Sequence, residues 1–470
     1  TGPPASHVSG LSVRAARSKM HTVGWKDMRM AAQRSAVVIL GASGDLAERK
    51  LVPALEKLYH RGALTDSDII VGSGRTPFTD AEFRARFNVS DDFARLLHYH
   101  RYLPGLKDYI AQRGSFSRVV FFMALPPFAY APTAAQLSEE GFGAESSLIV
   151  EKPFGYNYQS SRRLNRSLSR YFDESQIYRI DHYLAKEAVQ NILVFRFANS
   201  LFYPVWNSRY VESIQISAFE DQGVGHRAAY FDRSGIVRDM VQNHLTQLLC
   251  LLTMEAPVSL GAEDIREKKI DILRCLEVDE CHRYQYDGYR REQGIAPDST
   301  TETYAELKLH INNFRWTGMP VYIRTGKALD RRGTEIGMTF QRLPRLLYNE
   351  QGRLQPNRII FKIQPAEGIV MDISSKTPGS DAGIAKTHMD FCYRESFANE
   401  IPEAYQRLLL DVFRGDHTLF VGAEETETSW KLFENVLDKG DVPPYPKGIV
   451  PESKLDAEWI DFGRYAPICA

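Results

Sequence analysis

Residues 35–62 read SAVVILGASGDLAERKLVPALEKLYHRG, and this stretch decides how the first half of the chain folds. The β-branched run SAVVIL predicts a short buried strand. The leucine spacing in LVPALEKLYH predicts a helix that Gly62 ends. A glycine turn, GASGDL at 41–46, joins the two. A strand, a glycine turn and a helix in this order are typical of the first unit of a dinucleotide-binding fold.

The glycine turn has the chemistry of a pyrophosphate cradle. Gly41 allows a tight backbone bend, and Gly44 lets the chain approach an anion closely. The helix that follows presents free N–H groups and the positive end of its dipole to that anion. The spacing is GxxGxL and not GxGxxG, so the interpretation depends on the strand before the turn and the helix after it. The alternative is a tight turn that binds nothing.

Outward from this unit the sequence pattern divides the chain into two halves. Buried strands are predicted at 68–72, 118–125 and 146–153, and the helical stretches between them predict a parallel, doubly wound sheet. Beyond Tyr156, segments such as VESIQISAF, VYIRTG and RIIFKIQ alternate like strands, and several follow one another without helices. They predict a large antiparallel sheet, with helices at 236–252 and 402–414 against one face.

These patterns predict a fold class and three segments. We expect an α/β N-terminal dinucleotide-binding domain of Rossmann type and an α+β C-terminal domain with a large, mainly antiparallel sheet. Residues 1–34, rich in Ser, Ala and Arg, are expected to form a flexible tail, with a transit peptide as the alternative. The dinucleotide-binding domain then spans 35–176, and a domain for substrate binding and oligomerisation spans 177–470.

The composition argues against several classes of protein. The chain has 470 residues, of which 43% are hydrophobic and 25% charged, as in ordinary globular proteins. Its net charge of -1 offers no field for nucleic acid or an anionic membrane, and no apolar run reaches the ~20 residues of a membrane helix. Five cysteines without a CxxC motif argue against a disulfide scaffold or a zinc site. We therefore expect reduced thiols, no bound metal and a cytoplasmic protein, with another intracellular compartment as the alternative.

The end of the second predicted strand indicates which dinucleotide binds. Sites that prefer NAD commonly place an acid there, to bind the ribose 2′-hydroxyl. Here the segment is VGSGRT, with Arg75 in place of an acid. Because a guanidinium matches the oxygens of a 2′-phosphate, this residue favours NADP. The alternative is an ordinary surface arginine.

A lysine lies at the end of the strand LIVEKPFG. Ligands in open α/β sheets bind at the carboxyl ends of the strands, which is where the pattern puts Lys152. Pro153 holds the residue before it in an extended conformation. We therefore expect Lys152 to contact both cofactor and substrate; a lysine that merely reaches solvent at the rim is the alternative.

The stretch YRIDHYLAKEAVQN at 178–191 concentrates polar chemistry. If a helix begins near Tyr183, then His182, Tyr183 and Lys186 can direct a ring N–H, a hydroxyl and an ammonium at one anion, such as a sugar phosphate. The alternative is a plain helix start capped by Asp181.

A second polar group lies in the apolar helical stretch GIVRDMVQNHLTQLL. His244 has the pKa range of a general base, and a carboxylate beside it would stabilise the imidazolium formed by proton transfer. Asp181 is the candidate partner, although the two are far apart in the chain. The alternative is a buried histidine with a structural role.

Five of these motifs occur together in one known family. GASGDLA, EKPFG, RIDHYLAKE, RDMVQNHL and RTGKAL stand in the order and context of glucose-6-phosphate dehydrogenase, and the chain resembles that family from about Ser35 to its C-terminal region. The family usually has Gly where Ala185 stands, a mild departure. The resemblance implies oxidation of D-glucose 6-phosphate at C1 to 6-phosphoglucono-lactone, with hydride transfer to NADP. It also implies a homodimer or homotetramer.

The resemblance also implies roles for individual residues. His244 is implied as general base and Asp181 as its partner. The implied substrate-binding residues are Lys152, His182, Tyr183, Lys186, Glu220, Asp239, Lys327 and, less securely, Arg332 and Gln364. The implied cofactor-binding residues are Gly41, Ser43, Gly44, Asp45, Leu46, Arg75, Tyr130 and Lys152.

Two other functions remain open at this point. One is an NADP-linked oxidoreductase of an unphosphorylated sugar, which would not need the basic run from Tyr183 to Lys186. The other is a regulator that binds a dinucleotide without catalysis, which would have no use for His244 beside Asp181.

Overall fold

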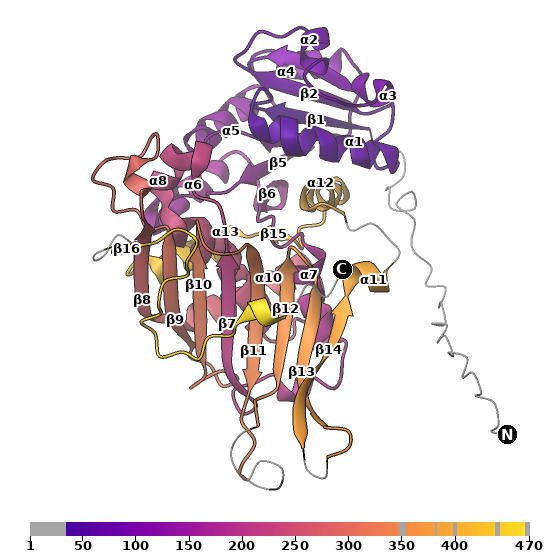
Figure 1. Cartoon of the computed structure of the whole chain (residues 1–470). Helices are drawn as coiled ribbons and strands as arrows, with labels where there is room; N and C mark the ends of the chain where they lie inside the picture. The colour runs from indigo at the N-terminus through magenta and orange to yellow at the C-terminus, as the bar shows by residue number, and fades with distance from the viewer. Residues whose placement is uncertain are drawn as a thin grey trace, which may run out of the picture.

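The computed structural model describes residues 34–345, 347, 354–380, 383–397, 402–437 and 442–465. They form two β-sheets, each with helices packed on it (Figure 1). The tail predicted at 1–34 lies outside the described residues except for Arg34, the residue before the first strand.

The first sheet has seven strands in the order β15-β6-β5-β4-β1-β2-β3. All pairings are parallel except that of β15 with β6. Strand β1 lies inside the sheet, so the glycine turn at its carboxyl end opens between β2 and β4. The parallel, doubly wound sheet predicted from the sequence is confirmed. The strands are β1 (Ser35–Leu40), β2 (Ile69–Gly74), β3 (Leu97–Arg101), β4 (Arg118–Met123), β5 (Ser146–Glu151), β6 (Ile177–Ile180) and β15 (Phe420–Val421).

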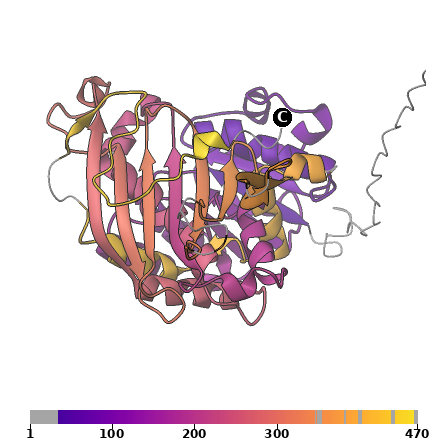
Figure 2. The ribbon, with the colours of Figure 1, turned by 60° about the horizontal axis from the view of Figure 1, so that its bottom comes forward.

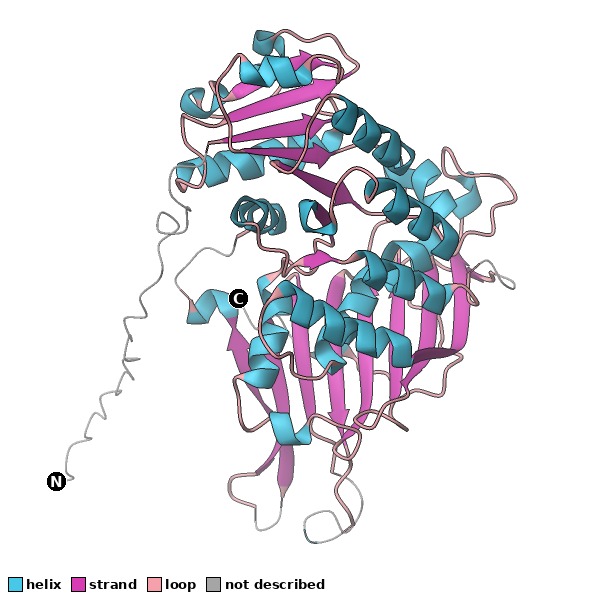
Figure 3. Ribbon diagram, turned by 180° about the vertical axis from the view of Figure 1, so that it is seen from behind, coloured by secondary structure: helices cyan, strands magenta, loops and turns pink. Residues whose placement is uncertain are grey.

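Helices cover both faces of this sheet (Figure 3). Each buries an apolar stripe against strands that are themselves buried on both sides, as parallel sheets require. The helices connecting these strands are α1 (Val52–His60), preceded by the π-helical turn η2 (Ala47–Leu51), α2 (Asp80–Arg84), α3 (Asp91–Ala94), α4 (Leu106–Ala111), α5 (Tyr130–Glu139) and α6 (Tyr158–Leu168).

The second sheet has nine strands in the order β14-β13-β12-β11-β7-β10-β9-β8-β16. Its pairings are antiparallel except β7 with β10 and β8 with β16, so the predicted mainly antiparallel sheet is confirmed. The strands are β7 (Val211–Phe219), β8 (Leu276–Tyr286), β9 (Tyr304–Ile311), β10 (Pro320–Gly326), β11 (Gly333–Phe340), β12 (Arg358–Gln364), β13 (Gly368–Lys376), β14 (Ile384–Cys392) and β16 (Pro444–Tyr445).

One face of the second sheet is covered by helices and the other by the C-terminal segment. The π-helical segment η7 packs on β10, α7 on β12 and α13 on β8. On the opposite face, residues 442–465 run across the strands (Figure 2), and Gln215 hydrogen-bonds the backbone of Glu458 and Ile460 there. The helices of this half are α7 (Glu187–Phe197), α8 (Ala228–Ile236), η7 (Val237–Leu245), α9 (Thr246–Thr253), α10 (Ala262–Cys275), α11 (Tyr393–Ser396), α12 (Ala404–Arg414) and α13 (Ala423–Phe433).

Several elements differ from the sequence expectations. The helix predicted near Tyr183 begins at Glu187 instead, because residues 182–185 form turns after β6. Strands β3, β8 and β14 lack a clean apolar alternation and were not predicted. The domain boundary at 176/177 stays a prediction, although β6 pairs with β5 and carries the first sheet beyond it.

The cysteines correct one expectation. Cys250, Cys275 and Cys281 are free, as expected. Cys392 is disulfide-bonded, so the thiols are not all reduced in this structure. Cysteine number and spacing did not reveal this bond, since no CxxC or paired pattern marks it.

Gly41 generates a prediction for the stability of the fold. Its φ is +86°, and a Cβ there would lie 2.2 Å from the carbonyl oxygen of Ala124. Gly41→Ala should therefore lower the free energy of unfolding by about 2 kcal/mol or more, measured by denaturant unfolding. Gly44→Ala is the matched control, because its nearest contact would be 3.2 Å away and its φ is not left-handed. An equal loss in both variants would contradict this account of Gly41.

Candidate active site

The glycine turn is held against the end of β2. The backbone N–H groups of Gly41 and Ala42 both donate to the carbonyl oxygen of Ser73, at 2.8 and 3.1 Å. Helical backbone begins at Asp45, directly after Gly44. The turn therefore places the N-terminal end of a helix directly after a tight bend, and this geometry fits a dinucleotide pyrophosphate.

Two arginines lie together beside this turn. Arg75 is exposed directly after β2, and Arg101 ends β3 opposite Gly74. The Arg101 Nε donates to the Arg75 carbonyl oxygen at 3.2 Å, so the Arg101 guanidinium lies against the Arg75 backbone. Sequence reasoning missed Arg101, because β3 was not predicted. This basic edge suits the 2′-phosphate of NADP.

The other predicted cofactor residues differ in what they offer a ligand. Ser43 is exposed, and its hydroxyl lies next to Gly74 at the end of β2. Asp45 pairs with Arg49 of its own helix at 2.6 Å, and Leu46 packs against the core. Tyr130 is buried, and its hydroxyl donates to the Glu151 carbonyl oxygen at 2.9 Å. Tyr130 thus supports the strand end that carries Lys152.

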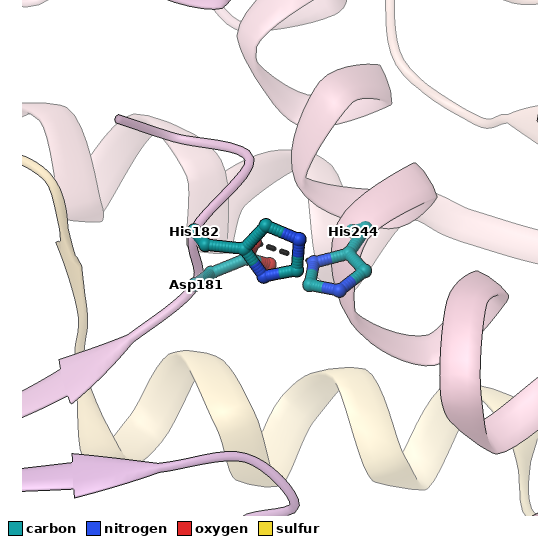
Figure 4. A group of neighbouring side chains, drawn as sticks. All are labelled: Asp181, His182 and His244. Carbon is teal, nitrogen blue, oxygen red and sulfur yellow. Dashed lines mark hydrogen bonds and ion pairs between the residues drawn. The ribbon is translucent and has the colours of Figure 1, made fainter. Parts of the chain in front are cut away.

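His244 and Asp181 form a buried hydrogen-bonded pair (Figure 4). The His244 Nδ1 lies 2.5 Å from Asp181 Oδ1, and the Tyr183 backbone N–H donates to the same oxygen at 3.0 Å. Asp181 follows β6 of the first sheet, whereas His244 lies on η7, which packs against the second. Among the described residues nothing hydrogen-bonds to His244 Nε2. One imidazole nitrogen of the pair is therefore buried without a hydrogen-bond partner.

Burial and charge set the protonation states of this pair. Burial alone would raise the pKa of Asp181, but His244 outweighs it by attraction and hydrogen bonding, and that pKa falls to about 2. Burial lowers the pKa of His244 below its ordinary value, and Asp181 opposes the shift without cancelling it. The resting pair at neutral pH is an imidazole beside a carboxylate, which is the state a general base requires.

Four charged residues form a chain next to this pair. Lys152 Nζ bonds the carbonyl oxygen of Asp239 at 2.8 Å and its carboxylate at 3.3 Å. Lys327 Nζ lies 2.7 Å from Glu220 Oε2 and 3.8 Å from Asp239 Oδ2. Burial would raise the pKa of Asp239, but the two lysines hold it below its usual range. The sequence predicted these residues for one substrate site, and the fold brings them together.

The strand order explains why these residues meet. β7 and β10 are parallel, so Glu220 and Lys327 follow adjacent strand ends. β11 runs antiparallel to β7, and β12 runs antiparallel to β11. Arg332, just before β11, and Gln364, the last residue of β12, therefore lie at the same end of the strands as Glu220 and Lys327. These strand ends of the second sheet face the residues that follow β5 and β6.

A cavity of about 1000 Å³ opens beside His182, whose ring packs edge-on against that of His244. Basic residues line it together with Glu187, Glu367 and Glu403. Four predicted residues line it: His182, Lys186, Arg332 and Gln364. Tyr183 is buried instead, and its hydroxyl lies 3.1 Å from Thr334 Oγ1 and 3.3 Å from Gln364 Nε2. Lys50 and Arg394 also line the cavity and were not predicted. Lys50 could have been found in the sequence as a basic residue on the helix that follows the glycine turn.

Asp181, His182 and His244 also meet the spacing of a metal-binding group. One donor atom from each lies within 4.8 Å of the others. Because His244 Nδ1 already bonds Asp181, the set resembles an acid–base pair more than three free ligands. The expectation of no bound metal stays a prediction.

Comparison with known proteins identifies relatives over most of the chain. Residues 38–191 match the family model "Glucose-6-phosphate dehydrogenase, NAD binding domain", and residues 193–459 match "Glucose-6-phosphate dehydrogenase, C-terminal domain". A glucose-6-phosphate 1-dehydrogenase of Dictyostelium discoideum is 38% identical over 92% of this chain and 92% of its own length. That of Bacillus subtilis is 38% identical over 86% of this chain and 91% of its own.

Solved structures agree with these matches. A glucose-6-phosphate dehydrogenase in complex with glucose 6-phosphate superposes with a TM-score of 0.84 at 34% identity, covering 90% of this chain and 97% of that one. The glucose-6-phosphate 1-dehydrogenase of Mycobacterium avium superposes with a TM-score of 0.81 at 34% sequence identity, and the match covers 89% of this chain and 94% of that one. A levoglucosan dehydrogenase, at 10% identity and a TM-score of 0.53, shares the fold alone. The chain thus belongs to the glucose-6-phosphate dehydrogenase family.

Proposed function

We propose that this protein oxidises D-glucose 6-phosphate at C1 to 6-phosphoglucono-lactone, with NADP as the hydride acceptor. The observation that carries the proposal is the buried pair of His244 and Asp181, whose imidazole Nε2 has no hydrogen-bond partner among the described residues, together with the basic groups in the cavity next to His182. The relatives' names state the same activity of those proteins.

His244 acts as the general base. Its Nε2 accepts the proton of the C1 hydroxyl while the C1 hydride leaves. Asp181 keeps Nδ1 protonated and stabilises the imidazolium that forms, at low cost because the two groups are already in contact in a dry setting. Bound NADP supplies the hydride acceptor, so the reaction itself needs no metal.

The charged chain orients the sugar ring. Lys152 follows β5 and bonds Asp239, which lies on the same helix as His244. Glu220 and Lys327 reach the same place from the second sheet. Carboxylates and ammonium groups held this way present both acceptors and donors to sugar hydroxyls.

The phosphate lies at the basic wall of the cavity. Lys186 and Arg332 supply charge and His182 a ring nitrogen, at the start of α7, where the helix dipole favours an anion. Tyr183 and Gln364 bond each other and act here as supports of that wall. An oxidoreductase of unphosphorylated sugars would have no use for this wall, and a non-catalytic regulator would have none for the free His244 nitrogen.

NADP lies across the glycine turn at Gly41–Gly44, with its 2′-phosphate toward Arg75 and Arg101. The left-handed backbone of Gly41 and the exposed basic edge support this position. Ser43, which follows β1, and Lys152, which follows β5, complete the proposed site at the carboxyl ends of two parallel strands that β4 separates.

We also propose a homo-oligomer and a cytoplasmic location. No helix in the described part of the chain is long and apolar enough to cross a membrane. The relatives include a protein named as cytoplasmic from Arabidopsis thaliana and one named as chloroplastic from Nicotiana tabacum. Fractionation and light scattering test both proposals.

His244→Asn should lower kcat by roughly 10²- to 10⁴-fold, because it removes the proton acceptor while keeping a polar side chain. In the unmodified enzyme, kcat/KM should fall only below pH 6.5, since burial depresses the pKa of His244 and its neutral form is the active one. Steady-state assays across pH check both. A variant with normal turnover, or an acid limb above pH 7, would contradict the assignment.

Lys186→Ala should raise KM for glucose 6-phosphate roughly 10- to 100-fold, the worth of one charge-assisted hydrogen bond. KM for glucose should change far less, because glucose carries no phosphate. Lys431→Ala, an exposed lysine of α13 outside the cavity, is the matched control. Equal effects on both sugars would refute the phosphate contact.

Arg75→Ala should raise KM for NADP roughly 10- to 100-fold and leave KM for NAD nearly unchanged. Arg95→Ala serves as control, since that exposed arginine lies before β3, at the other end of the strand from Arg101, and pairs with Asp92 at 3.4 Å. Equal losses with both dinucleotides would show that Arg75 does not read the 2′-phosphate.

A further inference from the structure

A second cavity, of about 410 Å³, lies between helices α7 and α10. On α7, the side chains of Gln190, Leu193, Val194 and Phe197 line it at the i, i+3, i+4, i+7 spacing of one helix face. Helices α7 and α10 both pack against α9, which lies between them. The apolar face of α7 is thus only partly covered, and Val194 remains 56% exposed.

The charged and amide groups around this cavity are already paired. Lys269 of α10 is buried, with Nζ 2.7 Å from Glu425 Oε1 and 3.0 Å from Gln247 Oε1. The Gln190 Nε2 donates to the Ala185 carbonyl oxygen at 3.2 Å. A charged ligand would find no free counter-charge here and would lose its hydration, so the lining selects a neutral molecule.

The size and shape of the cavity favour a small molecule over a protein segment. Its volume lies at the low end of the range for small-ligand sites, and its walls are mostly aliphatic and aromatic carbon. We propose that this cavity binds a compact, neutral, largely hydrocarbon ligand, and that occupancy alters the binding of the phosphorylated sugar.

The coupling follows from what the cavity walls are attached to. Leu184, which lines the cavity, belongs to the turn between Asp181 and Lys186. Gln190 hydrogen-bonds that same turn at Ala185. Leu251, another lining residue, lies on α9, which continues directly from the segment carrying His244. A ligand that moves any of these walls therefore moves the basic turn or the base.

The binding site is tested on the full chain with N-phenyl-1-naphthylamine, a neutral fluorophore whose emission rises in apolar surroundings. We expect saturable binding at one site per chain. Val194→Glu on α7 and Leu260→Glu on the opposite wall should each raise the dissociation constant at least tenfold. Leu201→Glu, an equally exposed leucine that does not line the cavity, should change it less than twofold. Unchanged melting temperatures would show that the variants fold.

Three results would overturn the site: no saturable binding, equal loss of binding in Leu201→Glu, or full binding in Val194→Glu and Leu260→Glu. The last would place the probe elsewhere, for example in the substrate cavity or on a surface used by a protein partner. None of these fluorescence results depends on catalysis, so they test the binding site independently of the proposed function.

The coupling rests on the proposed function and is tested by kinetics. Saturating probe should shift KM for glucose 6-phosphate at least twofold in the unmodified enzyme and in Leu201→Glu, but not in Val194→Glu or Leu260→Glu. By reciprocity, saturating glucose 6-phosphate should shift the probe's dissociation constant by a comparable factor. Saturable binding without either shift would overturn the coupling. Absence of any glucose 6-phosphate oxidation would instead refute the proposed function.

Discussion

The hydrogen bond between His244 and Asp181 connects the two halves of this molecule. It joins a turn of the first sheet to a helix packed on the second, and both side chains are buried. Losing one partner would leave the other's polar group in a dry interior, at a cost of several kcal/mol. The contact therefore joins the two halves, and in the proposed function it also holds the base.

Around this pair, acidic and basic side chains alternate, so that each buried charge has an opposite charge beside it. Lys152 and Lys327 hold Asp239 ionised against the effect of burial, and Glu220 balances Lys327. Burying such a network costs desolvation free energy, and it is useful where a ligand requires hydrogen-bond donors and acceptors in fixed directions. The cavity beside His182 carries basic residues apart from this network. The proposed function assigns the network to the sugar hydroxyls and those basic residues to the sugar phosphate.

Much of this arrangement could be predicted from the sequence, because local patterns carried it. The strand, turn and helix around Gly41 have strong periodicity, and the polar runs at 178–191 and 237–245 stand out from their apolar surroundings. Weakly patterned elements were not predicted. β3 is an edge strand with polar residues, so it was not predicted, and Arg101 at its end was missed as well. Lys50 and Arg394 line the cavity only because segments far apart in the chain fold toward it.

By itself the sequence determined the two-part architecture, because short-range periodicity encodes it, and Arg75 predicted NADP as the cofactor. The residues of the site were predicted from motif order and from the family resemblance that the motifs carry. The tertiary structure alone decided which of those residues meet. His244 and Asp181 touch only when η7 is placed against the end of β6, and Tyr183 is buried with its hydroxyl against Thr334. Contacts between segments far apart in the chain depend on packing of whole elements, which no local pattern specifies.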